Sequence, residues 1–281
     1  MVKLTFVIKC PDQPGIIAGV TRFIKEKGGN IVYIDQYVDR ENELFFMRLE
    51  ASFDKLSASF YQQFESSISK KFEMNCEIFE TNRIPRMAIF VSKYDHCLYD
   101  LLSQYKSGEL KVEIPFVLSN HSDLREATER FGIPFFHIPF TKDIRQQAEA
   151  EQLELLKKHQ VDFIVLARYM QIVSSILIEV YPNKIINIHH SFLPAFPGAK
   201  PYHSAYERGV KLIGATSHYV TEDLDSGPII AQDVTQVSHL HSIKDLISSG
   251  KELEKVVLSR AVKKHVARKV LSYANRTVVF H

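Results

Sequence analysis

The chain has 281 residues, of which 45% are hydrophobic and 24% are charged, which is ordinary for a globular protein with a normal core. Its 35 Lys and Arg residues nearly balance its 33 Asp and Glu residues, and the formal net charge is +2. This balance argues against the basic surface that a phosphate backbone requires, so no nucleic-acid partner is expected.

Cysteine usage and hydropathy indicate a cytoplasmic protein. The three Cys residues form no CxxC pair, which argues against a disulfide framework or a zinc knuckle. The apolar run at the N-terminus is too short and too interrupted by charge for a signal peptide. No stretch approaches the roughly 18 apolar residues of a membrane span, so no membrane partner is expected.

Residues 1–83 show the pattern of a small α/β domain. Apolar and polar residues alternate from Leu4 to Ile8, as in a half-buried strand. A turn over 11–15 precedes a helix that the Gly pair at 28 and 29 ends. The remaining expected elements are strands at 30–39, 45–53 and 74–79 and a helix at 56–68. The order βαββαβ predicts a ferredoxin-like sandwich.

The sequence CPDQPGIIAGVTRFIKEKGGNI resembles the first loop and helix of ACT domains, which sense small molecules in metabolic enzymes. The resemblance implies that an amino-acid effector binds at the start of this helix, where free N–H groups suit a carboxylate. In ACT domains this loop often lies at a subunit interface, so the resemblance also implies a homo-oligomer. The alternative is that the loop only forms the turn and the domain only joins subunits. The residues implied for the regulatory ligand are Asp12, Pro14, Gly15, Ile16 and Asn30.

From residue 84 to residue 183, apolar strands alternate with helices. The strands are expected at 87–91, 112–118, 133–138 and 161–166. A first helix is expected to begin with 98–102, and others at 124–130, 144–158 and 176–180. This alternation predicts a doubly wound, mostly parallel sheet, in which ligands bind beyond the carboxyl ends of the strands. The loop after the first of these strands, SKYDH, has no glycine, which argues against a phosphate-binding loop there.

The stretch from Lys184 to Asp233 is the candidate active site. Asn187 and His189 have the same parity on an apolar strand, so both side chains can lie on one face of the sheet. Thr216 and His218 do the same on a second strand, and Asp225 follows in a tight loop. An amide, an imidazole and a carboxylate at the ends of buried strands are typical of enzyme active sites.

Simpler interpretations apply to several of these residues. A single buried His is more often a hydrogen-bonded core residue than a catalyst. His189 and His190 are adjacent on a strand and point to opposite faces, which disfavours a shared metal ion, and no metal is predicted. The remaining expectations are that Tyr202, Glu207 and Arg208 lie on an exposed helix surface, that Ser242 and Asp245 cap a helix, that Gly250 separates two helices, and that 277–280 forms a last strand.

The sequences NIHHSFLPAF and GATSHYVTEDLDSGPIIAQ resemble the folate-dependent formyltransferase family, typified by glycinamide ribonucleotide transformylase. The resemblance implies that Asn187, His189 and Asp225 are catalytic. The segment VLARYMQIV is similar to the folate-binding segment of that family. The residues implied for folate binding are Leu166, Ala167, Arg168, Tyr169, Met170, Gln171 and Pro194.

With its ACT-like start, the whole chain resembles the formyltetrahydrofolate deformylase family. This implies an ACT-like regulatory domain at 1–83 and a formyltransferase-like catalytic domain at 84–281. It also implies hydrolysis of 10-formyltetrahydrofolate, a substrate and not a cofactor, to formate and tetrahydrofolate. Such a reaction would supply formate for purine synthesis and balance the one-carbon folate pool. No cofactor is expected.

The resemblance also assigns roles to the candidate residues. Asp225 would position the attacking water and act as general base, while Asn187 and His189 would donate hydrogen bonds to the developing oxyanion. His218 would orient Asp225, and Thr216 would support the site. For proton transfer to the leaving nitrogen, either burial raises the pKa of Asp225 or His189 is held protonated beside it. The loop at 193–201 would help to exclude water.

Two other functions are compatible with these residues. The first is transfer of the formyl group to an amine acceptor, although the absence of a glycine-rich loop after the first core strand favours water. The second is a non-enzymatic sensor of folate or amino acids with a vestigial site. Such a sensor would be stabilised by its ligand without turnover.

Overall fold

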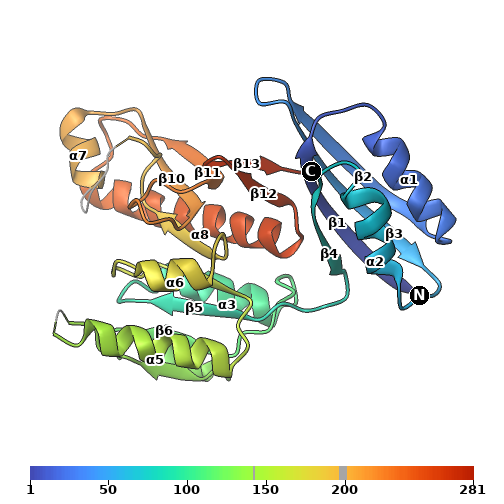
Figure 1. Cartoon of the computed structure of the whole chain (residues 1–281). Helices are drawn as coiled ribbons and strands as arrows, with labels where there is room; N and C mark the ends of the chain where they lie inside the picture. The colour runs from blue at the N-terminus through green and yellow to red at the C-terminus, as the bar shows by residue number, and fades with distance from the viewer. Residues whose placement is uncertain (142, 196–200) are drawn as a thin grey trace. The chain divides into compact units, whose positions relative to one another are not determined.

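The computed structural model describes residues 1–141, 143–195 and 201–281, which divide into two compact units (Figure 1). The first unit consists of residues 1–83, 268–271 and 278–281, and the second of residues 84–267 and 272–277. The predicted second domain, 84–281, therefore includes C-terminal residues that group with the first unit. They do so because Arg48 Nε donates a 3.0 Å hydrogen bond to the carbonyl of Arg268, and the Tyr33 hydroxyl donates to the carbonyl of His281.

The first unit has the predicted ferredoxin-like fold. Its elements are β1 (Val2–Pro11), α1 (Ile16–Glu26), β2 (Asn30–Asp39), β3 (Leu44–Phe53), α2 (Phe60–Phe64), the π-helical turn η1 (Glu65–Ser69) and β4 (Asn75–Glu80). The sheet has the antiparallel order β2-β3-β1-β4, and α1 and α2 cover one face of it (Figure 1). Phe6, Phe23, Phe60 and Phe64 pack ring against ring between the sheet and the helices, which gives the unit its own core.

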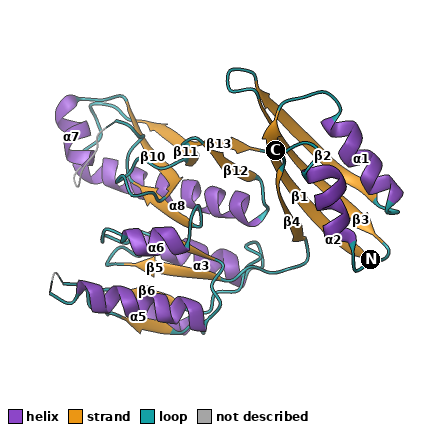
Figure 2. Cartoon of the chain, in the orientation of Figure 1, coloured by secondary structure: helices purple, strands orange, loops and turns teal. Residues whose placement is uncertain are grey.

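The second unit is built on a seven-stranded sheet of order β11-β10-β9-β8-β5-β6-β7 (Figure 2). Its strands are β5 (Met87–Val91), β6 (Val117–Ser119), β7 (Phe135–His137), β8 (Phe163–Leu166), β9 (Ile185–His189), β10 (Leu212–Tyr219) and β11 (Ile229–Gln236). Strands β5 to β9 pair in parallel, whereas β10 pairs antiparallel with both β9 and β11. The predicted mostly parallel sheet is confirmed.

Helices cover both faces of this sheet. They are α3 (His96–Lys106), α4 (Arg125–Arg130), α5 (Arg145–Lys158), α6 (Ser175–Val180), α7 (Pro201–Arg208) and α8 (Ile243–Val266). Apolar residues of α5 and α6 pack against β5, β6, β8 and β9 on one face, and α3 packs beside α8. No helix in the described ranges has both the length and the apolar character that a membrane crossing needs.

Two predicted elements differ in the structure. Strand β6 has only three residues, because 112–116 pairs through a single bridge between Arg86 and Glu113, and Pro115 has no N–H to donate. Gly250 does not separate two helices, since α8 continues through it for 24 residues after a capping box of Ser242 and Asp245. A single glycine costs a helix only about 1 kcal/mol, which packing offsets.

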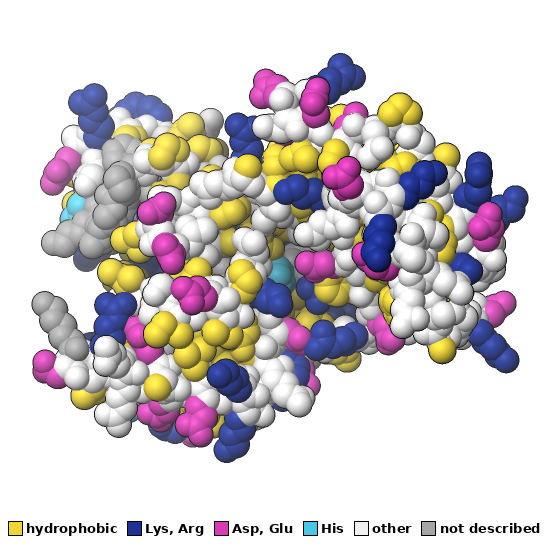
Figure 3. Space-filling view, viewed as in Figure 1, with side chains coloured by type: hydrophobic (Ala, Val, Ile, Leu, Met, Phe, Trp, Pro, Cys, Tyr) yellow, Lys and Arg dark blue, Asp and Glu magenta, His cyan; other side chains and the backbone are white. Residues whose placement is uncertain are grey.

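The chain ends in a hairpin of β12 (Val270–Tyr273) and β13 (Arg276–Val279), so the predicted last strand is present. Lys and Arg side chains are interspersed with Asp and Glu on the face shown in Figure 3. The visible charges therefore form no single-sign field on that face.

The strand order defines one special edge of the large sheet. From β5 the chain adds β6 and β7 on one side and then returns to add β8 and β9 on the other. The order therefore reverses between β5 and β8, and ligands of doubly wound sheets bind beyond the carboxyl ends of the strands at such a point. Leu166 at the end of β8 pairs with Phe90 of β5 and with Asn187 of β9, so these carboxyl ends lie at one level.

Candidate active site

The register of β9 and β10 brings four predicted site residues together. Asn187 lies opposite His218, and His189 lies opposite Thr216. Because opposite residues of an antiparallel pair project to the same face, all four side chains share one face of the sheet. The parity predicted for each strand separately thus places all four side chains on one shared surface.

Asp225 completes this group from the loop between β10 and β11. Its Oδ2 lies 3.2 Å from His189 Nδ1, and its Oδ1 lies 3.7 Å from His218 Nε2. The backbone of Asp225 is left-handed, with φ of 54°. The loop packs closely on β10, since a Cβ on Gly227 would come within 1.8 Å of the carbonyl oxygen of Tyr219. Two imidazoles thus lie beside one carboxylate, on the face of the sheet that also carries Asn187.

The pKa of Asp225 differs from one of the two expectations for proton transfer, the one in which burial raises it. The hydrogen bond from His189 and the neighbouring His218 ring hold the pKa of the Asp225 carboxyl far below its ordinary value, and they outweigh the opposing effect of burial. The expectation that burial raises this pKa is therefore wrong. An ionised carboxylate with so low a pKa is a good hydrogen-bond acceptor and a weak base.

His218 contacts Asn187 more closely than it contacts Asp225. Its Nδ1 lies 2.9 Å from the carbonyl of Tyr219, and because a carbonyl only accepts, this nitrogen carries the proton. In the neutral ring Nε2 is then an acceptor, and it lies 3.2 Å from Asn187 Nδ2. This bond orients the NH₂ group of Asn187, and its second N–H, which has no other partner among the described residues, can donate to an oxyanion.

His189 has one occupied and one free nitrogen. Its Nδ1 contacts Asp225, whereas its Nε2 is buried and has no hydrogen-bond partner among the residues that the structure describes. A buried nitrogen without a partner is costly, and a substrate atom would relieve that cost. The arrangement suits an imidazole that exchanges a hydrogen bond or a proton with a substrate.

Thr216 supports the site by holding the loop that follows β9. Its Oγ1 accepts from the backbone N–H of Leu193 at 3.0 Å and from Gln232 Nε2 at 2.9 Å, and donates to the carbonyl of Ser191 at 2.9 Å. Gln232 also donates to the carbonyl of Leu193 at 3.1 Å. These bonds hold the start of the loop after β9. Gln232 was missed by the sequence analysis, although it is the register partner of Thr216 on β11.

The loop predicted at 193–201 to exclude water lies mainly outside the described residues. Within the described part, Pro194 is exposed and follows Leu193 through a cis peptide bond.

The predicted folate-binding segment, 166–171, follows β8 directly. Leu166 and Ala167 are buried, and so are the side chains of Arg168 and Tyr169. The Tyr169 hydroxyl accepts a hydrogen bond from Gln152 Nε2 at 3.2 Å, and its ring packs on Phe90.

The inward side chains limit how this segment can meet a ligand. The guanidinium of Arg168 lies 4.9 Å from the centroid of the Tyr94 ring, so this side chain has protein partners. Met170 is 48% exposed and Gln171 is partly exposed. Met170 and Gln171 therefore offer side chains to a ligand, while Arg168 and Tyr169 offer mainly their backbone.

The residues predicted for a regulatory ligand lie around the start of α1 in the first unit. Gly15 precedes the helix with φ of 92°, a left-handed conformation that favours glycine, and no side chain caps the helix there. Asp12, Pro14 and Asn30 are exposed, and Ile16 is buried. The exposed backbone at this helix start is compatible with a carboxylate ligand or with a simple turn.

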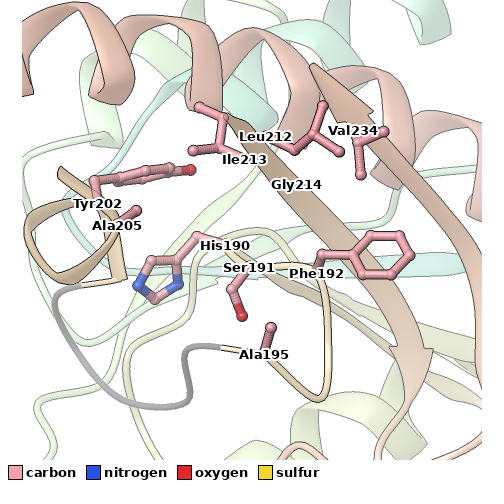
Figure 4. Close-up of a pocket in the computed structure, with 10 residues that line it drawn as sticks. All are labelled: His190, Ser191, Phe192, Ala195, Tyr202, Ala205, Leu212, Ile213, Gly214 and Val234. Atoms are coloured by element: carbon pink, nitrogen blue, oxygen red, sulfur yellow. The ribbon is translucent and has the colours of Figure 1, made fainter. Parts of the chain in front are cut away.

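A cavity of about 400 Å³ lies beside β10, β11 and α7 (Figure 4). In Figure 4, Tyr202 and His190 are on one side of it and Phe192 and Val234 on the other. Its lining is mainly apolar, and it contains none of the predicted catalytic or folate-binding residues. We assign no ligand to it.

One group of described residues has the side chains and spacing of a metal site. Ligand atoms of His96, Cys97 and Glu254 lie within 4.8 Å of one another. Arg168 Nε lies 3.4 Å from Glu254, and its positive charge opposes a cation there. Tyr202 donates a 2.7 Å hydrogen bond to Glu254 and is only 8% exposed, so the expectation that it lies on an exposed helix surface is wrong.

Two family models match the chain, a formyl transferase model over residues 85–262 and an ACT domain model over residues 5–57. A formyltetrahydrofolate deformylase of Synechocystis is 49% identical over 98% of this chain and 98% of its own length. A solved formyltetrahydrofolate deformylase from Pseudomonas syringae has a TM-score of 0.96 and 44% identity, covering 100% of this chain and 95% of that one. A glycinamide ribonucleotide transformylase 1 from Symbiobacterium toebii has a TM-score of 0.68 and 27% identity, covering 72% of this chain and 97% of that one.

Proposed function

The chain belongs to the formyl transferase family, and within it to the formyltetrahydrofolate deformylases, and we propose that it hydrolyses 10-formyltetrahydrofolate to formate and tetrahydrofolate. The observation that carries the proposal is the state of His189, whose Nδ1 contacts Asp225 at 3.2 Å while its buried Nε2 has no partner in the described structure. Such an imidazole can donate to a carbonyl oxygen or move a proton beside it.

The first chemical step is attack of water on the formyl carbon. Asp225, as an ionised acceptor, orients the water through one of its carboxylate oxygens. The carbonyl oxygen becomes negative as the C–O bond forms, and an N–H group of Asn187 stabilises it. The Nε2–H of His189 adds a second donor once this nitrogen has taken a proton from the water. One such donor contributes roughly 10²–10³-fold to the rate in comparable sites.

The second step breaks the bond between the formyl carbon and N10. The leaving nitrogen needs a proton. The low pKa of the Asp225 carboxyl keeps this group ionised, so it has no proton to give. We therefore assign the proton delivered to N10 to His189, which receives the proton that the attacking water loses. Hydrogen and charge are balanced. Water supplies the oxygen of formate, one of its protons reaches N10 through His189, and the other leaves when formic acid ionises to formate.

Formyl transfer to an amine is the alternative within the same family. It would use the same three residues, with an amine in place of the water. The loop from Ser92 to Asp95 that follows β5 contains no glycine, which disfavours a phosphorylated acceptor at that edge. The full-length similarity to deformylases also favours water, since the transformylase covers only 72% of this chain.

The test is to supply the purified protein with 10-formyltetrahydrofolate and no amine. We expect formate and tetrahydrofolate to appear in equal amounts. Tetrahydrofolate formation that depends strictly on an added amine would contradict hydrolysis and support transfer. A protein that is stabilised by folate but releases no formate would be a sensor with a vestigial site.

The ACT-like unit is the proposed site of an amino-acid effector in a homo-oligomer. The exposed residues around Gly15 support this assignment, since free N–H groups at a helix start suit a carboxylate. Thermal-shift measurements with each amino acid, on the protein and on Asp12→Ala, test it. An effector should raise the melting temperature of the protein more than that of the variant, and no response to any amino acid would favour a purely structural role.

A further inference from the structure

Three buried side chains and one partly buried one meet at the carboxyl edge of the large sheet, near the ends of β5 and β8. His96 begins α3 just after β5, Arg168 lies in the turn after β8, Tyr202 lies on α7, and Glu254 lies on α8. Their contacts with one another define a group that we call the Glu254 cluster. None of the proposed catalytic steps uses it, yet it occupies the edge where ligands of doubly wound sheets bind.

Glu254 is the centre of this cluster. Its side chain is 2% exposed, and its two oxygens have different partners. Oε1 accepts from the Tyr202 hydroxyl at 2.7 Å, while Oε2 lies 2.8 Å from His96 Nε2 and 3.4 Å from Arg168 Nε. Burial alone would raise the pKa of this carboxyl, but the His96 hydrogen bond and the Arg168 charge outweigh it and lower the pKa. Glu254 is therefore an ionised carboxylate inside the protein.

A buried ion pair is weak evidence for stability, because its desolvation offsets much of its attraction. The geometry of Arg168 indicates another role. Its backbone is left-handed, with φ of 62°, which is uncommon for a residue with a side chain. Such a conformation persists where surrounding contacts hold it, often at functional sites.

The turn that contains Arg168 is fixed at both ends by the rest of the sheet. The N–H of Ala167 donates to the carbonyl of Phe90 at 2.9 Å, and the N–H of Met170 donates to Ser92 Oγ at 3.0 Å. Between these bonds, two side chains attach the turn further. Tyr169 packs on Phe90 and accepts from Gln152, and Arg168 lies between the Tyr94 ring and Glu254.

Gly250 gives independent evidence that the cluster has a required shape. It lies four residues before Glu254 on the same face of α8, and a Cβ there would come within 2.1 Å of the Tyr202 hydroxyl oxygen. A glycine weakens a helix interior. At this position its absent side chain is what lets the Tyr202 hydroxyl reach Glu254.

We propose that Glu254 is a positioning residue for the folate substrate, which it serves by holding Arg168 and thereby the turn at 167–170. The proposal rests on the proposed function, because this turn is the predicted folate-binding segment. Glu254 itself is too deeply buried to touch the substrate. Its loss therefore weakens folate binding and leaves the chemical step, which Asn187, His189 and Asp225 perform, largely intact.

The test compares Glu254→Gln, Arg168→Gln and the double variant with the unmodified protein. Each single variant should raise KM for 10-formyltetrahydrofolate and Kd for tetrahydrofolate by about tenfold, while kcat changes by less than about threefold. If Glu254 acts through Arg168, the Kd of the double variant for tetrahydrofolate should be no higher than the higher of the two single-variant values. The control is Glu126→Gln, which removes an exposed ion pair with Arg130 on α4 and should leave both constants unchanged.

A lower melting temperature does not decide the question, because any break in a buried ion pair destabilises the fold. Unchanged KM and Kd in Glu254→Gln would overturn the proposal and leave a purely structural role. A loss of kcat at constant KM would also overturn it, and so would additive effects of the two substitutions on Kd in the double variant. If the unmodified protein released no formate, the proposed function would fail, but Kd for tetrahydrofolate would still test the positioning role.

Two milder variants keep the test decisive if Glu254→Gln does not fold. Tyr202→Phe removes one hydrogen bond to Glu254 and keeps the ring, and Gly250→Ala displaces the Tyr202 hydroxyl without altering Glu254. Each should raise Kd for tetrahydrofolate by about two- to fivefold at nearly constant kcat. Wild-type Kd in both folded variants would contradict the proposal.

Discussion

Replacement of Asp225 by Asn tests the proposed chemistry most directly. The substitution keeps the size of the side chain and removes its charge. Asn adopts left-handed backbone readily, so the φ of 54° at this position can be retained. We expect Asp225→Asn to fold, to bind tetrahydrofolate with nearly unchanged affinity and to release almost no formate.

The size of the effect follows from the contact with His189. An imidazolium and a carboxylate 3.2 Å apart attract each other by about 5 kcal/mol at an effective dielectric constant of about 20. Because about 1.4 kcal/mol corresponds to a tenfold change in rate, complete loss of this attraction in the transition state sets an upper bound of about 10⁴-fold. The Asn oxygen keeps part of the hydrogen bond and can still orient water, so kcat should fall by roughly 10²–10⁴-fold.

The assay measures formate and tetrahydrofolate from 10-formyltetrahydrofolate, together with tetrahydrofolate affinity by fluorescence. Asp223→Asn is the matched control, because Asp223 is an exposed carboxylate two residues away in the same loop, and it should keep full activity. More than about a tenth of wild-type kcat in Asp225→Asn would remove Asp225 from the mechanism. Loss of tetrahydrofolate binding would show that the substitution acts on affinity and not on chemistry.

Three further outcomes are expected. Asn187→Ala should lower kcat by about 10²–10³-fold, measured by formate release, because one oxyanion donor is lost; a change in KM alone would contradict that role. Gly227→Ala should lower the unfolding free energy by about 3 kcal/mol or more in urea titrations, since its Cβ would meet the Tyr219 carbonyl at 1.8 Å, and an unchanged midpoint would refute this packing. Because hydrogen bonds from His189 lower the folded-state pKa of the Asp225 carboxyl, wild type should be more stable than Asp225→Asn above about pH 4 and lose this advantage as the pH falls below it; an advantage that grows in acid would reverse the sign.

The fold was predictable where hydrophobic period and turn residues agree. The alternation from Leu4 to Ile8 and the buried runs of β5 and β8 each specify a strand and its covered faces. Prediction failed where a local rule met a stronger tertiary contact. Gly250 looks like a helix end, but the hydroxyl of Tyr202 needs the space that its missing side chain leaves. Apolar residues at 112–116 look like a strand, but Pro115 cannot donate a ladder hydrogen bond.

The candidate site was predictable in part because parity on a strand carries over to the folded sheet. Asn187 and His189 share a face, and the antiparallel register with β10 adds Thr216 and His218 to it. What the sequence could not specify is which contacts each polar atom makes. His189 donates to Asp225 and His218 lies beside it, and together they lower its pKa, whereas no spacing in the sequence indicates two imidazoles at this carboxylate.

Gln232 and Glu254 were missed for a related reason. Each is a single polar residue in an element that also has an exposed face, so its pattern is that of a solvated side chain. For Glu254 one signal was present, a glycine one turn earlier in a helix interior. A glycine there indicates close approach of another group, and the same helix face then carries Glu254.

Asp225 and Glu254 are both ionised carboxylates in the second unit, and their exposure separates their functions. The Asp225 side chain is 24% exposed and stands beside a histidine nitrogen that has no partner in the described structure, so it can meet a substrate. The Glu254 side chain is 2% exposed and has its partners within the protein, so it acts on a substrate only through Arg168. Substitution of the first should therefore lower kcat, and substitution of the second should raise KM. If both substitutions changed the same kinetic constant, this separation of functions by exposure would be wrong.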